Sequence, residues 1–292
     1  MIRKETSEKR EFYKPFRCIA GYILALQVIV SLLQMSSTGL MSIAMMIFTN
    51  PDVADFFSNL ILYGTMVLGY YLGYRIFFKK YVHQVYSKES FDSKQLPKLL
   101  LTMAGTFFVV LASWQLWAML LDAFGYTLPE GDSAVGLADI LYICIGAPVI
   151  EELVFRYWFR KVMQPYGCWT YVLISALSFG LFHGTVSQSV PATAIGIAFG
   201  LIAWHYQATW PTVILHIANN TLSTLETFYE ISISENVILI GAGIFVLIML
   251  VLSIRKINWR ELPKPLRLIP HSYSYLIFMI MYIVTILIEA LA

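Results

Sequence analysis

Two adjacent acids and an arginine, Glu151, Glu152 and Arg156, end an apolar run that starts near Leu137. A charged side chain at the centre of a membrane helix costs about 2.5–3.5 kcal/mol, so ionisable residues there are candidate functional groups. Glu152 and Arg156 are four residues apart and share one helix face, which favours an ion pair. Glu151 is turned by about 100° from Glu152 and is left to face something else. Alternatively, all three residues sit at the membrane interface and extend into the headgroups.

Three more polar residues interrupt apolar segments. His183 ends the stretch that starts at Phe179, and His216 and Asn220 lie four residues apart on one helix face. A lone histidine in a membrane helix more often only bonds a neighbouring helix. The combination can do more, because a carboxylate and an imidazole can take a proton from water, and a second histidine and an amide can stabilise an oxyanion.

The same residue types leave a zinc site open, since imidazole and carboxylate are zinc ligands. However, the sequence has no His-Glu-x-x-His helix, so the usual zinc protease pattern is absent. It also lacks the Gly-x-Ser-x-Gly turn of serine hydrolases. We therefore predict no cofactor and keep zinc as the less favoured alternative.

The composition is that of a polytopic membrane protein. Hydrophobic residues make up 58% and charged residues 13% of the 292 residues, against roughly 45–50% and 25% in soluble proteins. The net charge of +2 gives no indication of nucleic-acid binding. The three cysteines are odd in number and irregularly spaced, so they predict neither a disulfide framework nor a cysteine metal site.

Apolar runs and basic loops predict an all-α helical membrane bundle with about 8–9 transmembrane helices. The expected spans are 16–35, 59–78, 99–121, 137–159, 169–183, 191–206, 211–229, 236–254 and 272–291. We interpret residues 36–57 as an interfacial or re-entrant segment, because their apolar part is too short to cross about 30 Å of hydrocarbon. Lysines and arginines place the N-terminus and the 79–98 and 255–271 loops in the cytoplasm.

Small residues predict two close helix contacts, one at Gly69 and Gly73 and one at Ala192, Gly196 and Gly200. One conflict arises from the spans. Read as straight helices, they leave Glu151 and His183 at depths that differ by about 10 Å. Either a re-entrant turn at Pro165-Tyr166-Gly167 starts the fifth span deep in the bundle, or that span is strongly tilted.

Three motifs in order, Glu151-Glu152-x-x-x-Arg156, Phe179-x-x-x-His183 and His216-x-x-x-Asn220, resemble those of the CPBP family, the CAAX prenyl protease and bacteriocin-processing (Abi) proteins. The resemblance covers roughly residues 137–230. It implies a glutamate-type intramembrane protease. Glu151 would be the general base, His183 its partner on the water, and His216 and Asn220 the oxyanion site. Glu152, Arg156 and Phe179 would have supporting roles.

We therefore expect a catalytic core at 137–230, preceded by a basic leader and three peripheral spans at 1–136 and followed by two spans at 231–292. The expected substrate is a membrane-associated peptide or protein of the leader, pheromone, bacteriocin or CAAX type, and the expected location is a bacterial cell membrane. Two rivals remain. One is a non-catalytic scaffold or regulator with a membrane partner. The other is a proton-coupled transporter, which the lack of an internal repeat disfavours.

Overall fold

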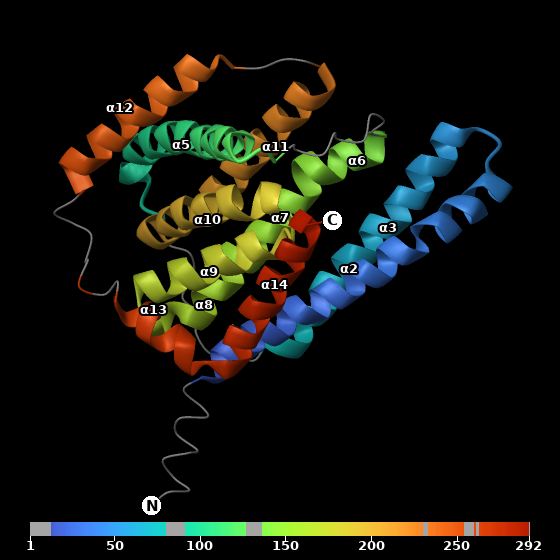
Figure 1. Cartoon of the computed structure of the whole chain (residues 1–292), viewed down its shortest axis with the longest axis horizontal. Coiled ribbons are helices and arrows are strands. Elements are labelled where there is room, and N and C mark those ends of the chain that lie inside the picture. Colours follow the sequence, from blue (N-terminus) through green and yellow to red (C-terminus); the bar gives the residue numbers. More distant parts are fainter. Residues whose placement is uncertain are drawn as a thin grey trace, which may run out of the picture.

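The structure, a computed structural model, describes residues 13–79, 91–126, 136–229, 233–253, 260 and 263–291 (Figure 1). These residues form helices and no strand, which confirms the all-α prediction. The basic leader up to residue 12, most of the 79–98 and 122–136 loops, residues 230–232 and nearly all of 254–262 lie outside the described residues. The basic residues that place the N-terminus and the 79–98 and 255–271 loops in the cytoplasm are therefore described only in part.

The described helices support a polytopic membrane protein. Four of them are long and apolar enough to cross a membrane, namely Lys14–Leu33, Pro51–Phe78, Ser93–Ala123 and Val186–Tyr206. A fifth candidate is the pair Pro265–His271 and Tyr273–Ile288, which is bent by 89°. The other predicted spans are also helical in the described residues.

Residues 36–57 do not form a re-entrant segment of their own, whereas their interfacial location stays a prediction. Helix α2 (Lys14–Ile47) runs without a break through residues 36–47, since nothing in that stretch stops a helix. Helix α3 (Pro51–Gly73) then begins at once, with the Asn50 side chain accepting hydrogen bonds from the N–H groups of Asp52 and Val53 at 2.8 and 3.2 Å. Asn50 is thus an N-cap and Pro51 occupies the first helical turn. A π-turn, η1 (Tyr74–Phe78), continues α3.

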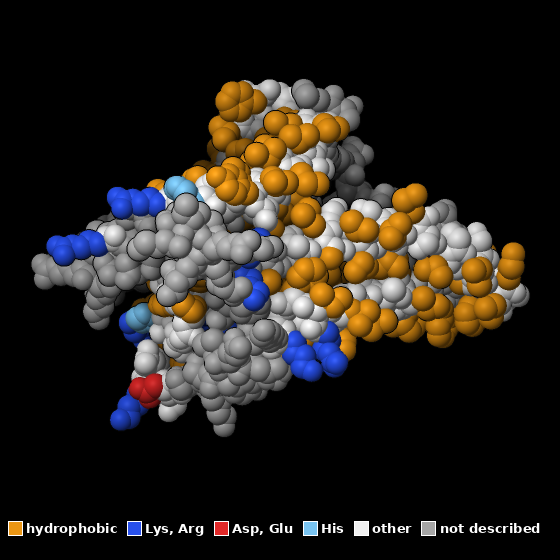
Figure 2. All heavy atoms as spheres, turned by 90° about the horizontal axis from the view of Figure 1, so that it is seen from below, with side chains coloured by type: hydrophobic (Ala, Val, Ile, Leu, Met, Phe, Trp, Pro, Cys, Tyr) orange, Lys and Arg blue, Asp and Glu red, His pale blue; other side chains and the backbone are white. Residues whose placement is uncertain are grey.

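Helices α2 and α3 form a long antiparallel arm (Figure 1). A Cβ atom on Gly69 would lie 3.1 Å from the Ile29 side chain, and one on Gly73 would lie 2.6 Å from the Tyr22 ring. The predicted glycine face therefore packs against α2. The outer faces of the arm carry exposed hydrophobic side chains, among them Met46 (Figure 2). Such a surface suits contact with lipid.

Helices α9 (Cys168–Phe182) and α10 (Val186–Tyr206) form the tightest pair of the core. A Cβ atom on Gly196 would lie 2.8 Å from the Cα atom of Ala176, and one on Gly180 would lie 2.5 Å from the carbonyl oxygen of Ser189. Neither position has room for a side chain. The predicted small-residue stripe on the sixth span is therefore a helix–helix contact.

The remaining helices surround this pair (Figure 1). Helix α5 (Leu96–Ala123), preceded by a 3₁₀ turn η2 (Ser93–Gln95), contacts α10, α11 (Trp210–Tyr229) and α12 (Glu235–Ser253). Helix α14 (Tyr273–Leu291) packs on α2 and α9, after α13 (Pro263–Leu268) and the 3₁₀ turn η7 (Ile269–His271). The central hydrophobic cluster joins α2, α8, α9, α10 and α14 around the segment that carries Glu152.

The membrane orientation stays a prediction, and an exposed residue at one end of the bundle can test it. We expect a Lys94→Cys variant lacking the native cysteines to resist an impermeant maleimide in intact cells and to react after permeabilisation, because the 79–98 loop is basic. Ser234→Cys, exposed between α11 and α12, is the matched control and should react in intact cells, because the 230–235 loop is acidic and has no lysine or arginine. Labelling of position 94 from outside would overturn this topology.

Candidate active site

The two glutamates lie in a helical segment with two π-stretches. Five elements follow one another without interruption: α6 (Leu137–Leu141), η3 (Tyr142–Gly146), α7 (Ala147–Glu152), η4 (Leu153–Trp158) and α8 (Phe159–Met163). Pro148 offers no backbone N–H, and its ring does not fit a regular helical turn. The preceding turn is widened, so that the N–H of Ala147 bonds to the carbonyl of Tyr142 five residues back. Such π-turns often occur at functional sites.

This segment ends at Met163, four residues beyond the predicted end of span four. Arg160 and Lys161, just beyond the predicted span, are buried at 2% and 4% exposure. The Arg160 guanidinium donates a hydrogen bond to the carbonyl of Ala203 on α10. The segment therefore packs inside the bundle over its whole C-terminal half.

Glu152 and Arg156 form the predicted ion pair. Nη1 of Arg156 lies 3.2 Å from Oε1 of Glu152, and both side chains are 0% exposed. Because both are fully buried, they do not extend into the headgroups. The guanidinium also lies over three phenylalanine rings, at 4.4 Å from the centre of Phe179, 5.5 Å from Phe199 and 5.9 Å from Phe155. These cation–π contacts stabilise a charge far from water.

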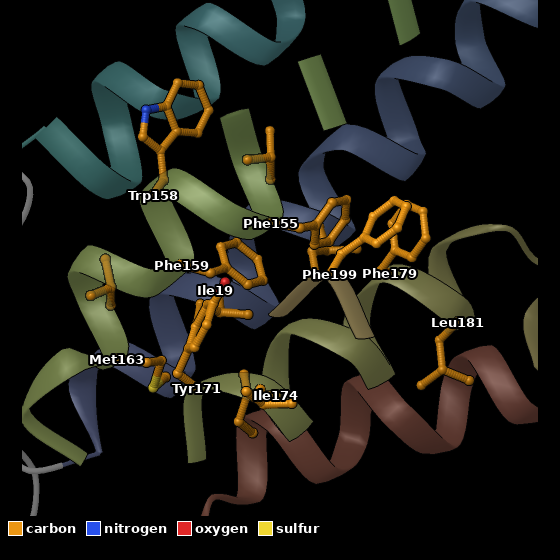
Figure 3. Packing of buried hydrophobic residues seen from close by; sticks show 14 of the residues in the cluster. Ile19, Phe155, Trp158, Phe159, Met163, Tyr171, Ile174, Phe179, Leu181 and Phe199 are labelled. Carbon is orange, nitrogen blue, oxygen red and sulfur yellow. The ribbon is translucent and has the colours of Figure 1, made fainter. Parts of the chain in front are cut away.

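Figure 3 shows Phe155, Phe179 and Phe199 side by side in the core. Phe155 and Phe179 meet edge to face with their ring centres 5.2 Å apart. Phe155, Phe179 and Phe199 come from η4, α9 and α10, respectively. The guanidinium of Arg156 is therefore enclosed by three different segments. Phe155 and Phe199 carry no sequence signal that separates them from other core phenylalanines.

His216, from α11, touches both glutamates. Its Nδ1 lies 2.9 Å from Oε1 of Glu152, and its Nε2 lies 3.6 Å from Oε2 of Glu151. The Glu152 contact is a hydrogen bond, whereas the Glu151 contact is slightly longer than one. The Glu151 side chain is 16% exposed and that of His216 is 6% exposed. His216 therefore connects a fully buried carboxylate to a partly accessible one.

The hydrogen bond to Glu152 indicates which ring nitrogen of His216 carries a hydrogen. An ionised carboxylate can only accept, so the Nδ1 of His216 carries the hydrogen that Glu152 receives. In the neutral ring Nε2 is then an acceptor, and it faces the acceptor Oε2 of Glu151. These two acceptor atoms can therefore both receive hydrogen bonds from one group that carries two hydrogens. Alternatively, they can share one additional proton.

His183 follows the last residue of α9. Its Nδ1 lies 2.8 Å from the carbonyl oxygen of Phe179, so Nδ1 donates and Nε2 is left as an acceptor. The Phe179 ring lies 4.8 Å from the His183 ring and 5.7 Å from the His216 ring, both edge to face. His183 also lies within electrostatic range of Glu151. Phe179 therefore separates and positions the two histidines.

The turn before α9 removes the predicted depth conflict. A 3₁₀ turn, η5 (Gln164–Tyr166), and Gly167 with φ +91° reverse the chain, and α9 starts at Cys168. Helix α9 runs back along η4, where Ser175 Oγ donates to the carbonyl of Phe155 at 2.7 Å. Since Phe179 contacts Phe155 and the two segments are antiparallel, His183 returns to the level of Glu151. The predicted turn at Pro165-Tyr166-Gly167 is therefore present, while the tilt of the fifth span in the membrane stays a prediction.

Asn220 is tied to the glutamate helix. Its Nδ2 donates to the carbonyl of Ile143 in η3 at 2.9 Å, and its Oδ1 accepts from Nδ2 of Asn219 at 3.1 Å. One Nδ2 hydrogen remains outside these bonds. No hydrogen bond joins Asn220 to the other predicted site residues in the described part of the chain. Asn219 was not predicted as a site residue, although it is the sequence neighbour of Asn220.

Residues 133–222 match the family model of type II CAAX prenyl endopeptidase Rce1-like proteins. This segment is Rce1-like. The resemblance to the CPBP family is thereby confirmed. The matched range contains Glu151, His183, His216 and Asn220, while α2, α3, α5, α12 and α14 lie outside it. No curated protein and no solved structure matches the chain. The Rce1-like family is a protease family, which supports a membrane protease of the CAAX type.

The side chains of Glu151 and His216 also determine whether this segment could bind a metal ion. Within the described ranges, no three His, Cys, Asp or Glu side chains lie close enough together to hold a metal ion. Nε2 of His216 and Oε2 of Glu151 are acceptors that a metal could use. A chelator therefore distinguishes a metal-dependent site from a metal-independent one.

Proposed function

We propose that this protein is an intramembrane peptidase that hydrolyses a peptide bond of a membrane-associated substrate with a water held by Glu151 and His216. The observation that carries this proposal is the 3.6 Å approach of Oε2 and Nε2, with Nδ1 of His216 committed to Glu152. A water beside these two atoms donates one hydrogen to each. Its oxygen lone pairs then remain free to attack a carbonyl carbon.

In this mechanism Glu151 is the general base. It takes a proton from water as the new bond to the carbonyl carbon forms, and it returns that proton to the leaving amine. General bases contribute typically about 10²–10⁴-fold to the rate. His183, whose Nε2 is also an acceptor near Glu151, is the alternative to His216 for the water hydrogen that Glu151 does not take. No metal and no covalent intermediate is required.

We assign His216 and Glu152 roles that differ from those the resemblance implies. With its hydrogen on Nδ1, neutral His216 has none on Nε2 to donate to an oxyanion. We assign His216 to the water instead. Glu152, held by Arg156, fixes the orientation and the tautomer of His216. Glu152 and Arg156 are therefore positioning residues.

The oxyanion is assigned to the second Nδ2 hydrogen of Asn220. We expect Asn220→Ala to lower kcat by about 10²–10³-fold with little change in KM, because the donor acts mainly in the transition state. Asn220→Asp is the matched control, since it keeps the shape but loses the N–H group and should lose a similar factor. Unchanged kcat in both folded variants, measured by product formation, would remove Asn220 from the oxyanion site.

The family match favours a CAAX-type substrate, and leader, pheromone or bacteriocin peptides are the alternatives from the sequence. We place the protein in a cell membrane with its N-terminus in the cytoplasm. The test uses purified protein in proteoliposomes with a panel of farnesylated CAAX peptides and apolar leader peptides, read out by mass spectrometry. We expect cleavage of at least one class at a single bond, and we expect it to persist with a zinc chelator.

Two other outcomes have clear meanings. Cleavage that stops with chelator and returns with zinc would replace the water-activating pair by a metal site. A folded protein that cuts none of the peptides but co-purifies with a membrane partner would favour the scaffold or regulator.

A further inference from the structure

A cavity of about 520 Å³ lies next to the candidate active site, between α5, α11, the start of α10 and the start of α12. Figure 1 shows α5 near both α11 and α12. Trp117 on α5 donates a hydrogen bond at 2.9 Å to the carbonyl of Val186, the first residue of α10, and so links two of its walls. The polar residues that line the cavity are Gln115, Gln188, Asn219, Ser223, Glu226 and Glu235.

The cavity continues the catalytic face of α11. His216, Asn219, Ser223 and Glu226 follow one another at steps of three, four and three residues, which places them on one face of a helix. Asn219 lines the cavity and donates to Asn220 at 3.1 Å. The cavity therefore begins one hydrogen bond away from the proposed oxyanion site and extends toward the C-terminal end of α11.

The charged residues that are described in the lining of this cavity are all acidic. Glu226 and Glu235 line it, whereas no lysine or arginine among the described residues does. Oε1 of Gln115 is buried and accepts no hydrogen bond from the described residues. Two carboxylates and a free acceptor beside apolar walls favour a ligand that brings positive charge and several hydrogens. An ammonium group has three donors and a guanidinium has five.

We propose that this cavity binds a lysine or arginine side chain of the substrate peptide and so sets which peptides are cut. The proposal rests on the peptidase function proposed above. Glu226 is ten residues beyond His216, or about 15 Å along the helix. An extended peptide covers about 3.3 Å per residue. The basic residue would therefore stand about four or five residues from the scissile bond, and an acidic residue there is disfavoured.

A cysteine thiol placed in the cavity measures the preference for positive charge without any cleavage. In a Ser223→Cys variant lacking the native cysteines, we expect a cationic methanethiosulfonate reagent to react at least about tenfold faster than an anionic one, after both rates are normalised to a free thiol. Glu226→Gln with Glu235→Gln should remove this preference. Asp122→Asn is the matched control, because Asp122 is an exposed acid near the end of α5 that does not line the cavity. It should keep the preference.

Peptide occupancy is read with the same thiol. Two apolar peptides that differ only in one lysine or glutamate are added, and we expect the lysine peptide to slow modification of the cysteine several-fold while the glutamate peptide does not.

Equal protection by both peptides, no protection by either, or a preference that survives loss of both glutamates would overturn the proposal. Cleavage without any charge preference would leave the peptidase function standing. Charge-selective protection without cleavage would leave the cavity site standing and remove the peptidase function.

Discussion

Replacing Glu151 with glutamine is expected to lower the cleavage rate by about 10²–10⁴-fold while the protein stays folded. Glutamine keeps the shape and can still contact a water, but it cannot take the proton. The Glu151 side chain is partly exposed and forms no ion pair with a lysine or arginine among the described residues, so its loss leaves no buried charge unpaired. KM should change little. The measurement is kcat in proteoliposomes beside a thermal melting curve.

Glu152→Gln is the informative comparison for this prediction. The neighbouring glutamate is the same residue type, yet it holds Arg156 and His216 instead of facing the partly accessible side. Its amide oxygen can still accept the hydrogen from His216. We therefore expect a smaller loss of rate but a larger loss of stability than in Glu151→Gln. Full activity in Glu151→Gln would remove this residue from the mechanism and favour a scaffold or a transporter.

Arg156→Ala is expected to destabilise the protein strongly, by about 3–5 kcal/mol, because it leaves the charge of Glu152 buried and unpaired. The cost includes the three ring contacts that the guanidinium loses. The double variant Glu152→Gln with Arg156→Gln removes both charges and should accumulate better than Arg156→Ala. The measurements are expression yield and melting temperature in detergent.

Arg267→Ala is the matched control, since Arg267 is exposed on α13 and should melt as the wild type does. If Arg156→Ala also melts like the wild type, the ion pair does not hold the core together. The same result would weaken the assigned orientation of His216, because Glu152 would then need no counter-ion to keep its place.

Local spacing made part of the site predictable. The Glu152–Arg156 pair follows from a four-residue separation within one helix, and the turn at 165–167 follows from proline and glycine. The contact between Glu152 and His216 spans 64 residues and depends on how α11 packs on α7, which no local pattern encodes.

In the N-terminal helices, the sequence pattern was a poor guide to where the helices begin and end. From their hydropathy, we predicted that residues 36–57 are separate from the first span. However, no residue between 36 and 47 stops the helix. Length and apolarity report on what can cross a membrane, whereas helix ends depend on caps and prolines such as Asn50 and Pro51. The enclosure of Arg156 by Phe155 and Phe199 was also not predictable, because many buried phenylalanines have the same local sequence character.

The most direct test of the central claim is the chemical fate of the new carboxyl group. Cleavage in proteoliposomes is run in water enriched in oxygen-18 with hydroxylamine present, and the N-terminal product is weighed by mass spectrometry. If Glu151 and His216 direct water onto the peptide bond, the product carries one oxygen-18 atom from solvent and no hydroxamate forms. A hydroxamate product would reveal a covalent acyl intermediate and would contradict the proposed mechanism.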